Sequence, residues 1–314
     1  MKPFFCLMTI AAVLAAAEPV RVIFDTDIGN DIDDALAMAI LHAMESRGES
    51  RLLAVTVTKD NPWAPRAASA INTFYGRASI PVGTVRNGVT RDDGKYNRAI
   101  AENFPHGEKF EDAVSVLRST LEAQPDKSVT IVQVGFSTNL AALLASPGGK
   151  ELAQRKVKQI VVMAGHFTNP KFTEYNVKED VVSAKKVFDE WPTEIVASGF
   201  EIGEQIKYPA RSIENDFAWV PRHPVAEGYR AYMKMPYDRE TWDLTAALYA
   251  VRGGRGYFGL SQTGTIHVQP KGETLFEPSP QGRHRYLTVD ELQKARILEV
   301  FQALAAEPPC YSRK

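Results

Sequence analysis

The stretch VIFDTDIGNDIDDALAMAI, residues 22–40, places five aspartates within ten positions, between an apolar run and an alanine-rich one. The apolar run ends near Asp27 and predicts a strand, and the alanine-rich pattern begins near Asp34 and predicts a helix. The aspartates would then lie on the loop that joins the two. Like charges at this density repel one another and destabilise a fold unless a positive group lies among them.

Other short runs rich in valine and isoleucine recur along the chain. They are continuous rather than alternating, which is typical of strands that are buried on both faces. The runs are residues 21–27, 51–58, 129–136, 158–165 and 193–200. Helical patterns lie between them, and this alternation predicts an α/β fold with a mostly parallel central sheet and helices on both faces. In such folds the ligand site lies at the carboxyl ends of the strands.

The last third of the chain shows a different pattern. Residues 205–240 read as helical and irregular, and residues 239–253 predict a long helix. Beyond it, GTIHVQP (264–270) and RHRYLTV (283–289) alternate as strands do, and residues 291–307 predict a final helix. We find no Gly/Ser-rich linker and no repeat, so the sequence predicts a single domain.

Residues 1–17 match a secretory signal peptide. Lys2 precedes an apolar run, and small residues at the end of that run offer a cleavage site after Ala17. The run is shorter than the roughly 20 residues of a membrane-spanning helix, and no later stretch approaches that length. We therefore expect residues 18–314 to form the mature domain and to be exported to the periplasm or the extracellular space. Cys310 would then be the one remaining cysteine.

The overall charge limits the classes of partner. The chain carries 37 basic and 38 acidic side chains, a formal net charge of −1, and 44% of its residues are hydrophobic. This balance gives no electrostatic footprint for nucleic acid or for an anionic membrane surface.

Two familiar motifs can be set aside. GRGYFG (254–259) has the letters of a dinucleotide-binding loop, but it follows a predicted helix instead of a strand. The aspartate cluster is not an EF-hand either. Counted from Asp25, the fifth, sixth and twelfth positions are Gly29, Asn30 and Leu36, where an EF-hand needs an Asp or Asn, a Gly and a Glu.

Two interpretations of the aspartate cluster remain. Aspartates favour turns and helix N-caps, where each contributes a few tenths to about 1 kcal/mol. Such capping explains one or two of them. A hard divalent cation explains all five, because calcium collects six to eight oxygen ligands. The loop contains no histidine or cysteine, which argues against zinc.

The same residues resemble the calcium-dependent nucleoside hydrolases, the inosine–uridine-preferring family. DTDIGNDIDDALA (25–37) resembles the N-terminal fingerprint of that family, with Asn30 and Asp31 as a two-residue insertion. The resemblance continues through most of the mature chain, in LAVTVTKDN (53–61), VQVGFSTNLAALL (132–144), the stretch 161–188 with its Glu-aromatic-Asn triplet, and WDLTAALYAV (242–251).

The resemblance implies a role for each matching residue. Asp27 would contact a Ca²⁺ ion and act as general base toward a water on that ion, and Asp33 would hydrogen-bond a ribose hydroxyl. The other metal ligands would be Asp34, the backbone carbonyl of Val134 and Asp243. The remaining sugar ligands would be Asn61, Asn169, Glu174 and Asn176. The implied reaction is hydrolysis of the N-glycosidic bond of a ribonucleoside. The implied assembly is a homodimer or homotetramer.

The chain departs from the family at Trp242, where the inosine–uridine-type enzymes usually carry a histidine that protonates the departing base. Tryptophan is no acid at neutral pH. It can stack on a purine, as in the purine-specific branch, or it can be a core residue; Trp63 is a second, weaker candidate for stacking. The proton would then come from water or from a residue of the 205–240 segment.

The sequence therefore leaves three hypotheses. The first is an exported, calcium-dependent nucleoside hydrolase with some preference for purines. The second is a non-catalytic exported protein that binds a nucleoside or ribose at the same site. The third is a hydrolase of another N-ribosyl compound. Retention of Asp27, Asp34, Asn176 and Asp243 together favours catalysis, since a pure binding protein has no use for a base.

Overall fold

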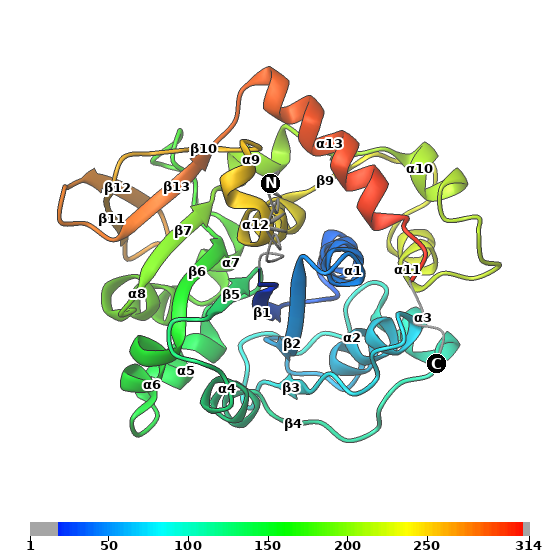
Figure 1. Ribbon diagram of the computed structural model, residues 1–314, viewed down its shortest axis with the longest axis horizontal. Helices are drawn as coiled ribbons and strands as arrows, with labels where there is room; N and C mark the ends of the chain where they lie inside the picture. Colours follow the sequence, from blue (N-terminus) through cyan, green and yellow to red (C-terminus); the bar gives the residue numbers. More distant parts are fainter. Residues whose placement is uncertain (1–17, 310–314) are drawn as a thin grey trace, which may run out of the picture.

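One large, mostly parallel β-sheet runs through the molecule, and helices cover both of its faces (Figure 1). The computed structural model describes residues 18–309, so the predicted signal peptide 1–17 and Cys310 lie outside the described residues. The α/β fold with a single domain that the sequence predicts is confirmed. No helix within residues 18–309 combines the length and the apolar character needed to cross a bilayer.

The strands are β1 (Val20–Thr26), β2 (Ser50–Val57), β3 (Val82–Thr84), β4 (Glu111–Asp112), β5 (Val129–Gln133), β6 (Val157–Met163), β7 (Glu194–Ser198), β8 (Lys207–Tyr208), β9 (Arg239–Glu240), β10 (Gly259–Leu260), β11 (Gly264–Val268), β12 (Thr274–Pro278) and β13 (His284–Thr288). The helices are α1 (Asp33–Ser46), α2 (Trp63–Phe74), α3 (Asn97–Asn103), α4 (Ala113–Glu122), α5 (Thr138–Ala145), α6 (Gly149–Lys156), α7 (Tyr175–Glu179), α8 (Val181–Glu190), α9 (Phe200–Glu204), α10 (Ala210–Asn215), α11 (Pro224–Tyr232), α12 (Trp242–Arg252) and α13 (Glu291–Ala305), with a 3-10 turn at Gly253–Arg255.

Strand β1 lies at the point where the winding of the sheet reverses. The strand order is β12-β11-β13-β7-β6-β5-β1-β2-β3-β4, so the chain builds outward from β1 to β4 on one side and from β5 to β7 on the other. β1 is parallel to both neighbours, and Asp25 is in register with Thr56 of β2 and Gln133 of β5. Ligands bind at such a switch point, outside the carboxyl ends of the strands.

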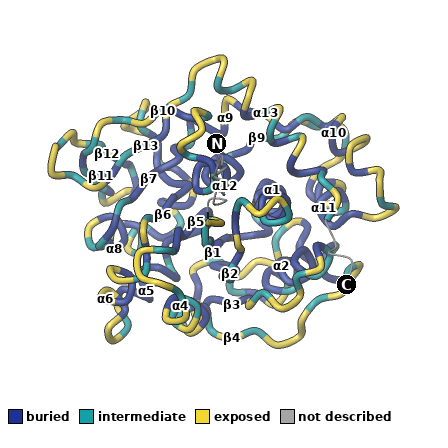
Figure 2. The backbone as a smooth tube through the Cα atoms, viewed as in Figure 1, coloured by how far each residue is buried: buried dark blue, intermediate teal, exposed yellow. Residues whose placement is uncertain are grey.

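Alternate residues of β1 enter two separate hydrophobic cores. Val22 and Phe24 pack with α1, α12 and α13, whereas Ile23 packs on the opposite face with residues of α4, α5 and α8. Both faces of the strand are therefore buried, as its continuous apolar run predicts. Figure 2 shows the central strands and α1 as buried and the outer loops as the exposed part of the tube.

Helix α1 is buried on all sides, which is unusual for a helix that starts with two aspartates. Twelve of its 14 residues are buried, and it packs between β2, α12 and α13. Small side chains at Ala35, Ala37, Ala39 and Ala43 let these neighbours approach closely. The buried position of α1 brings its acidic first turn to the carboxyl end of β1.

Some short elements were not predicted. The strand expected over 129–136 ends at Gln133, and the helix expected over 239–253 begins at Trp242. Strands β3, β4 and β12 gave no signal, because two or three residues carry no periodicity and β12 is largely exposed. Their pairing depends on neighbours that are distant in the sequence.

Gly135 permits the close approach of β5 to the end of β1. A Cβ atom at this position would lie 2.5 Å from the Asp27 backbone nitrogen and 2.6 Å from Thr58 Oγ1. We expect Gly135→Ala to lower the free energy of unfolding by about 1–3 kcal/mol, because the backbone has to move. Equilibrium unfolding in urea measures this change.

Gly254→Ala is the matched control, since a Cβ there meets nothing within 4 Å. Its free energy of unfolding should stay within about 0.5 kcal/mol of the parent value. Equal stability of the Gly135 and Gly254 variants would contradict the tight approach of the two strands.

Candidate active site

A cavity of about 390 Å³ opens at the carboxyl ends of β1, β5 and β6, at the predicted edge of the sheet. Its wall combines carboxylates on one side with aromatic rings and two cationic side chains on the other. The lining residues are Asp27, Asn30, Asp31, Asp33, Asp34, Lys95, Val134, Met163, Glu174, Tyr175, Asn176, Phe200, Tyr232, Arg239, Trp242 and Asp243.

Two helix N-termini bring three carboxylates together in this cavity. Asp33 and Asp34 lie in the first turn of α1 and Asp243 in the first turn of α12, and one oxygen of each lies within 4.8 Å of the others. The Asp34 carboxylate accepts a hydrogen bond from Thr26 Oγ1, and Asp33 Oδ2 accepts one from the Asp243 backbone N–H at 3.0 Å. The positive ends of both helix dipoles point at the same acidic trio.

Capping does not explain this trio. The N-cap of α1 is Ile32, and no side chain of that cap hydrogen-bonds the first turn. Asp33, Asp34 and Asp243 are each at most 5% exposed. Burial, followed by the negative charge of neighbouring aspartates, raises the pKa of all three well above the usual range. The donor set consists of oxygens, and a hard divalent cation takes such ligands. These residues therefore fit a divalent metal ion.

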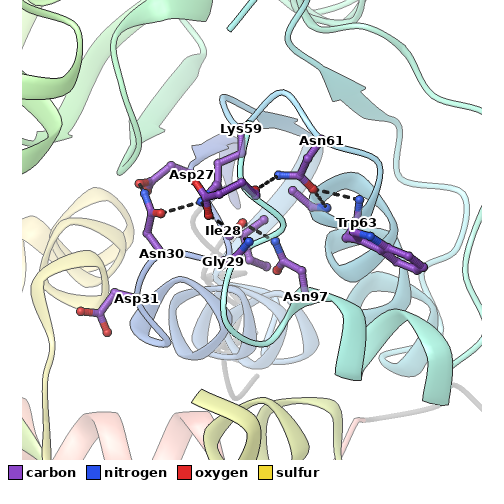
Figure 3. Close-up of polar contacts among 12 residues, drawn as sticks. Asp27, Ile28, Gly29, Asn30, Asp31, Lys59, Asn61, Trp63 and Asn97 are labelled. Atoms are coloured by element: carbon purple, nitrogen blue, oxygen red, sulfur yellow. Dashed lines mark hydrogen bonds and ion pairs between the residues drawn. The ribbon is translucent and has the colours of Figure 1, made fainter. Parts of the chain in front are cut away.

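Asp27 lies in the same cavity but outside the trio, and its carboxylate accepts a hydrogen bond from Asn30 (Figure 3). Asn30 Nδ2 donates to Asp27 Oδ2 at 2.5 Å, and Lys59 Nζ donates to Asn30 Oδ1 at 2.6 Å. Burial raises the pKa of Asp27 to about 6, against the lowering effects of the Asn30 hydrogen bond and the Lys59 charge. The acidic trio thus contains Asp33, for which the resemblance implies a contact with the sugar and not with the metal.

Asp25 points away from the cavity and organises the strand ends. Its Oδ1 accepts hydrogen bonds from Thr56 Oγ1 and Asn139 Nδ2, and its backbone carbonyl accepts one from the Val134 N–H at 2.7 Å. The latter bond fixes Val134, whose carbonyl is one of the predicted metal ligands. Burial raises the pKa of Asp25 to about 7.

Glu174 and Asn176 reach the cavity from the N-terminus of α7. Glu174 caps α7 and accepts from the backbone N–H groups of Asn176, Val177 and Gly165. Asn176 Nδ2 donates to the carbonyls of Val134 and Met163, so its Oδ1 remains available to a ligand. Burial raises the pKa of Glu174 to about 7.

Asn61 and Asn169 do not line the cavity. Asn61 Oδ1 accepts from the backbone N–H groups of Trp63 and Ala64 at the start of α2, and its Nδ2 donates to the Asp92 carbonyl (Figure 3). Asn169 is exposed, and its Oδ1 accepts from the Lys171 N–H. Their roles as sugar ligands stay predictions.

The opposite wall is aromatic. Trp242 packs on Phe200 with ring centroids 5.0 Å apart, and its Nε1 donates to the Phe200 carbonyl at 2.9 Å. The Arg239 guanidinium lies 5.4 Å from the ring centroids of both Trp242 and Tyr232 and forms an ion pair with the inserted Asp31. Tyr232 and Arg239 come from the irregular 205–240 segment.

Trp63, the second candidate for stacking, does not line the cavity, and neither does His166. Trp63 lies outside the cavity, between the guanidinium groups of Arg66 and Arg98. His166 pairs with Glu201 at 3.3 Å behind the Phe200 ring.

Sequence reasoning missed Asn30, Asp31, Lys59, Lys95, Met163, Phe200, Tyr232 and Arg239. The insertion itself was the available signal for the first two, since extra residues inside an acidic loop need partners of their own. The others lie far from the loop in the sequence and gave no pattern.

The family pattern of the inosine-uridine preferring nucleoside hydrolases matches residues 22–299, from β1 into α13. The match includes every element that contributes to the cavity. The chain therefore belongs to the inosine-uridine preferring nucleoside hydrolase family.

Relatives of known sequence or structure agree with this. The pyrimidine-specific ribonucleoside hydrolase RihA of Shewanella sp. strain MR-4 is 32% identical over 227 residues, 66% of each chain, so this chain spans just under two thirds of the length of that curated relative. The plant nucleoside hydrolase PpNRh1 shares the fold with a TM-score of 0.71 at 22% identity, over 92% of this chain and 100% of that one. A purine-preferring ribonucleoside hydrolase from Gardnerella vaginalis does so with a TM-score of 0.74 at 17% identity, over 91% and 98%.

The raised carboxylate pKa values predict how stability depends on pH when divalent cations are chelated. Asp25 and Glu174, with pKa values of about 7, bind protons in the folded chain that the unfolded chain, with pKa values near 4, has released. The melting temperature should therefore rise as the pH falls from 8 to 6.5. Below pH 6.5 buried His42 and His223, whose pKa values burial lowers to about 3, oppose this trend.

Added Ca²⁺ should raise the melting temperature more at pH 8 than at pH 6.5, because it binds ionised carboxylates. Asp243→Asn should remove most of this gain, whereas Asp126→Asn, which alters an exposed carboxylate beside Lys156, should leave it unchanged. Differential scanning fluorimetry measures both effects. A Ca²⁺ response equal in both variants would contradict the assignment of the trio.

Proposed function

We propose that this chain hydrolyses the N-glycosidic bond of ribonucleosides and releases ribose and the free base. The observation that carries the proposal is the cavity itself. Buried Asp27 and the acidic trio lie opposite an aromatic wall in it, at the switch point of the sheet. The chain belongs to the inosine-uridine preferring nucleoside hydrolase family. The carboxylates can accept hydrogen bonds from the sugar hydroxyls, and the aromatic rings can stack on a base.

The residues of the cavity suit the chemistry of this reaction. Breaking the bond passes through a state in which positive charge develops on the ribose ring, and preorganised carboxylates stabilise such charge. Asp27 would take a proton from the attacking water, a contribution of roughly 10²–10⁴-fold. Asp33, Glu174 and the free Oδ1 of Asn176 are placed to hold the sugar hydroxyls in orientation.

Calcium is the cofactor that we propose. Asp34, Asp243, the Val134 carbonyl and Asp27 would hold it, with Asp33 beside them. A bound divalent cation supplies polarisation of its oxygen ligands and neutralises part of the charge of the carboxylates. We also propose that the mature chain is exported, as the pattern of residues 1–17 indicates.

We propose a preference for purines on the basis of the aromatic wall. Trp242 and Phe200 form a surface on which a two-ring base has more contact area than a pyrimidine. RihA is named for pyrimidine specificity, so base preference needs its own test.

Release of free base tests the proposed function. We expect residues 18–314 to release base from at least one of inosine, adenosine, guanosine, uridine and cytidine when Ca²⁺ is present, and to stop when it is chelated. Asp27→Asn should lower kcat by at least about 10²-fold, since the base is lost. Liquid chromatography of the products measures both.

Two results would contradict the proposal in different ways. An Asp27→Asn variant that works at the parental rate would remove Asp27 as the base. A chain that binds Ca²⁺ and a nucleoside but cleaves none of the five would favour the non-catalytic binding protein or another N-riboside.

Trp242→Ala tests the stacking of the base. Loss of one stacked ring costs about 1–3 kcal/mol, so kcat/KM for inosine should fall at least about 5-fold more than kcat/KM for uridine. Trp63→Ala removes a tryptophan side chain outside the cavity, and it should change kcat/KM for neither inosine nor uridine. Equal losses for both substrates in Trp242→Ala would end the stacking proposal.

A further inference from the structure

Lys59 is a fully buried ammonium beside the acidic loop, and it does not line the cavity. Its side chain is 0% exposed, and its Nζ lies 2.6 Å from Asn30 Oδ1 and 2.6 Å from Asp92 Oδ1. A buried lysine destabilises a protein unless its charge and its donors are matched. Here one partner is a carboxylate and the other is the inserted amide of Asn30.

The chemistry of Lys59 fixes the orientation of this amide. An ammonium group can only donate, so the Asn30 carbonyl oxygen must face it. The Asn30 NH₂ group then faces Asp27 Oδ2, 2.5 Å away, and can only donate to it (Figure 3). A chain of hydrogen bonds therefore runs from Asp92 through Lys59 and Asn30 to Asp27, and every link has a defined donor.

The backbone on both sides of Asn30 is also fixed. The Gly29 carbonyl accepts from the Lys95 N–H at 2.9 Å, and the Tyr96 hydroxyl accepts from the Gly29 N–H and donates to the Asp31 carbonyl. Gly29 has φ +119°, and a Cβ there would lie 2.2 Å from Asn97 Nδ2, so only glycine fits. These contacts hold the backbone of the loop in place, and the bonds to Lys59 and Asp27 hold the Asn30 side chain.

Asn61 holds Asp92, the residue at the far end of this series of hydrogen bonds. Its Nδ2 donates to the Asp92 carbonyl at 2.8 Å while its Oδ1 receives the first N–H groups of α2. Helix α2 is thus connected through Asp92 to Lys59, and through Lys59 to the acidic loop.

We propose that Asn30, held by Lys59 and Asp92, is a positioning residue that fixes the Asp27 carboxylate for the hydrolytic step. The proposal rests on the proposed function and adds a role for the two-residue insertion. One oxygen of Asp27 is bound by Asn30, so the carboxylate cannot rotate and its other oxygen is presented in one orientation. Lys59 reaches Asp27 by hydrogen bonds only through Asn30, and its charge also lowers the pKa of the Asp27 carboxyl.

Asn30→Asp separates positioning from packing. The new carboxylate has the same size and can still accept from Lys59, but it cannot donate to an ionised Asp27. We expect kcat to fall about 10–100-fold in both Asn30→Asp and Asn30→Ala, with KM changed by less than about 3-fold. If Asn30 only packs against Lys59, Asn30→Asp will keep the parental kcat.

A double-mutant cycle tests the link to Lys59. Lys59→Met should lower kcat in the same way, and adding it to Asn30→Ala should cost less than it does in the parent, because both changes break the same series of hydrogen bonds. Asp92→Asn is a milder variant at the exposed end, should Lys59→Met not fold. Lys156→Met, which removes a mostly buried lysine from its pair with Asp126, is the matched control and should leave kcat unchanged.

The measurements are kcat, KM and melting temperature for each variant, with Ca²⁺ affinity by calorimetry as a readout that does not need turnover. Additive losses from Asn30→Ala and Lys59→Met, or a parental kcat in Asn30→Asp, would overturn the positioning role alone. A parent chain that releases no base would overturn the proposed function and this proposal together. The expected result is a kcat that falls by more than the Ca²⁺ affinity does, because Asp34, Asp243 and the Val134 carbonyl would still hold the ion.

Discussion

The structure depends on burying several carboxylates at one point. Asp33, Asp34 and Asp243 meet in the first turns of two helices, and each helix dipole contributes only about 0.3–1 kcal/mol toward a negative charge. Burying an unpaired ion costs several kcal/mol, which is far more. The folded chain must therefore take up protons or a cation at this point, and the two compete. This competition links the stability of the protein to the chemistry of its cavity.

The apolar core is what forces the carboxylates together. Helix α1 is buried on all sides between the sheet, α12 and α13, so its first turn has one available place, beside the end of β1. α12 packs against α1 and β6, which sets the position of Asp243. The reversal of strand order at β1 leaves a crevice in front of both helix ends. Hydrophobic burial thus supplies the free energy that holds repelling charges in place.

The sequence predicted what its local patterns encode. Strands β1, β2, β5, β6 and β7 were found because each is a buried apolar run, and Asp27 and Asp34 because they lie in the acidic stretch between β1 and α1. Val134 and Asp243 were implied by the family resemblance, and both line the cavity. Asn61 and Asn169 were placed by analogy along the chain, and they lie outside the cavity because their side chains serve local turns. Lys59 and Arg239 reach the acidic loop across the fold, and spacing in the sequence carries no information about such contacts.

Asn30 and Asp31 connect the carboxylate side of the cavity with its aromatic side. Asn30 faces Asp27 on the carboxylate side, whereas its neighbour Asp31 pairs with Arg239 on the aromatic side. Both side chains of this ion pair are 22% exposed, so solvent screens part of the attraction between them. The effect of the pair is geometric, because it holds the Arg239 guanidinium against the rings of Tyr232 and Trp242. Any movement of the loop that displaced Asn30 would also displace Arg239, so the orientation of Asp27 and the shape of the aromatic wall are set by the same few backbone bonds.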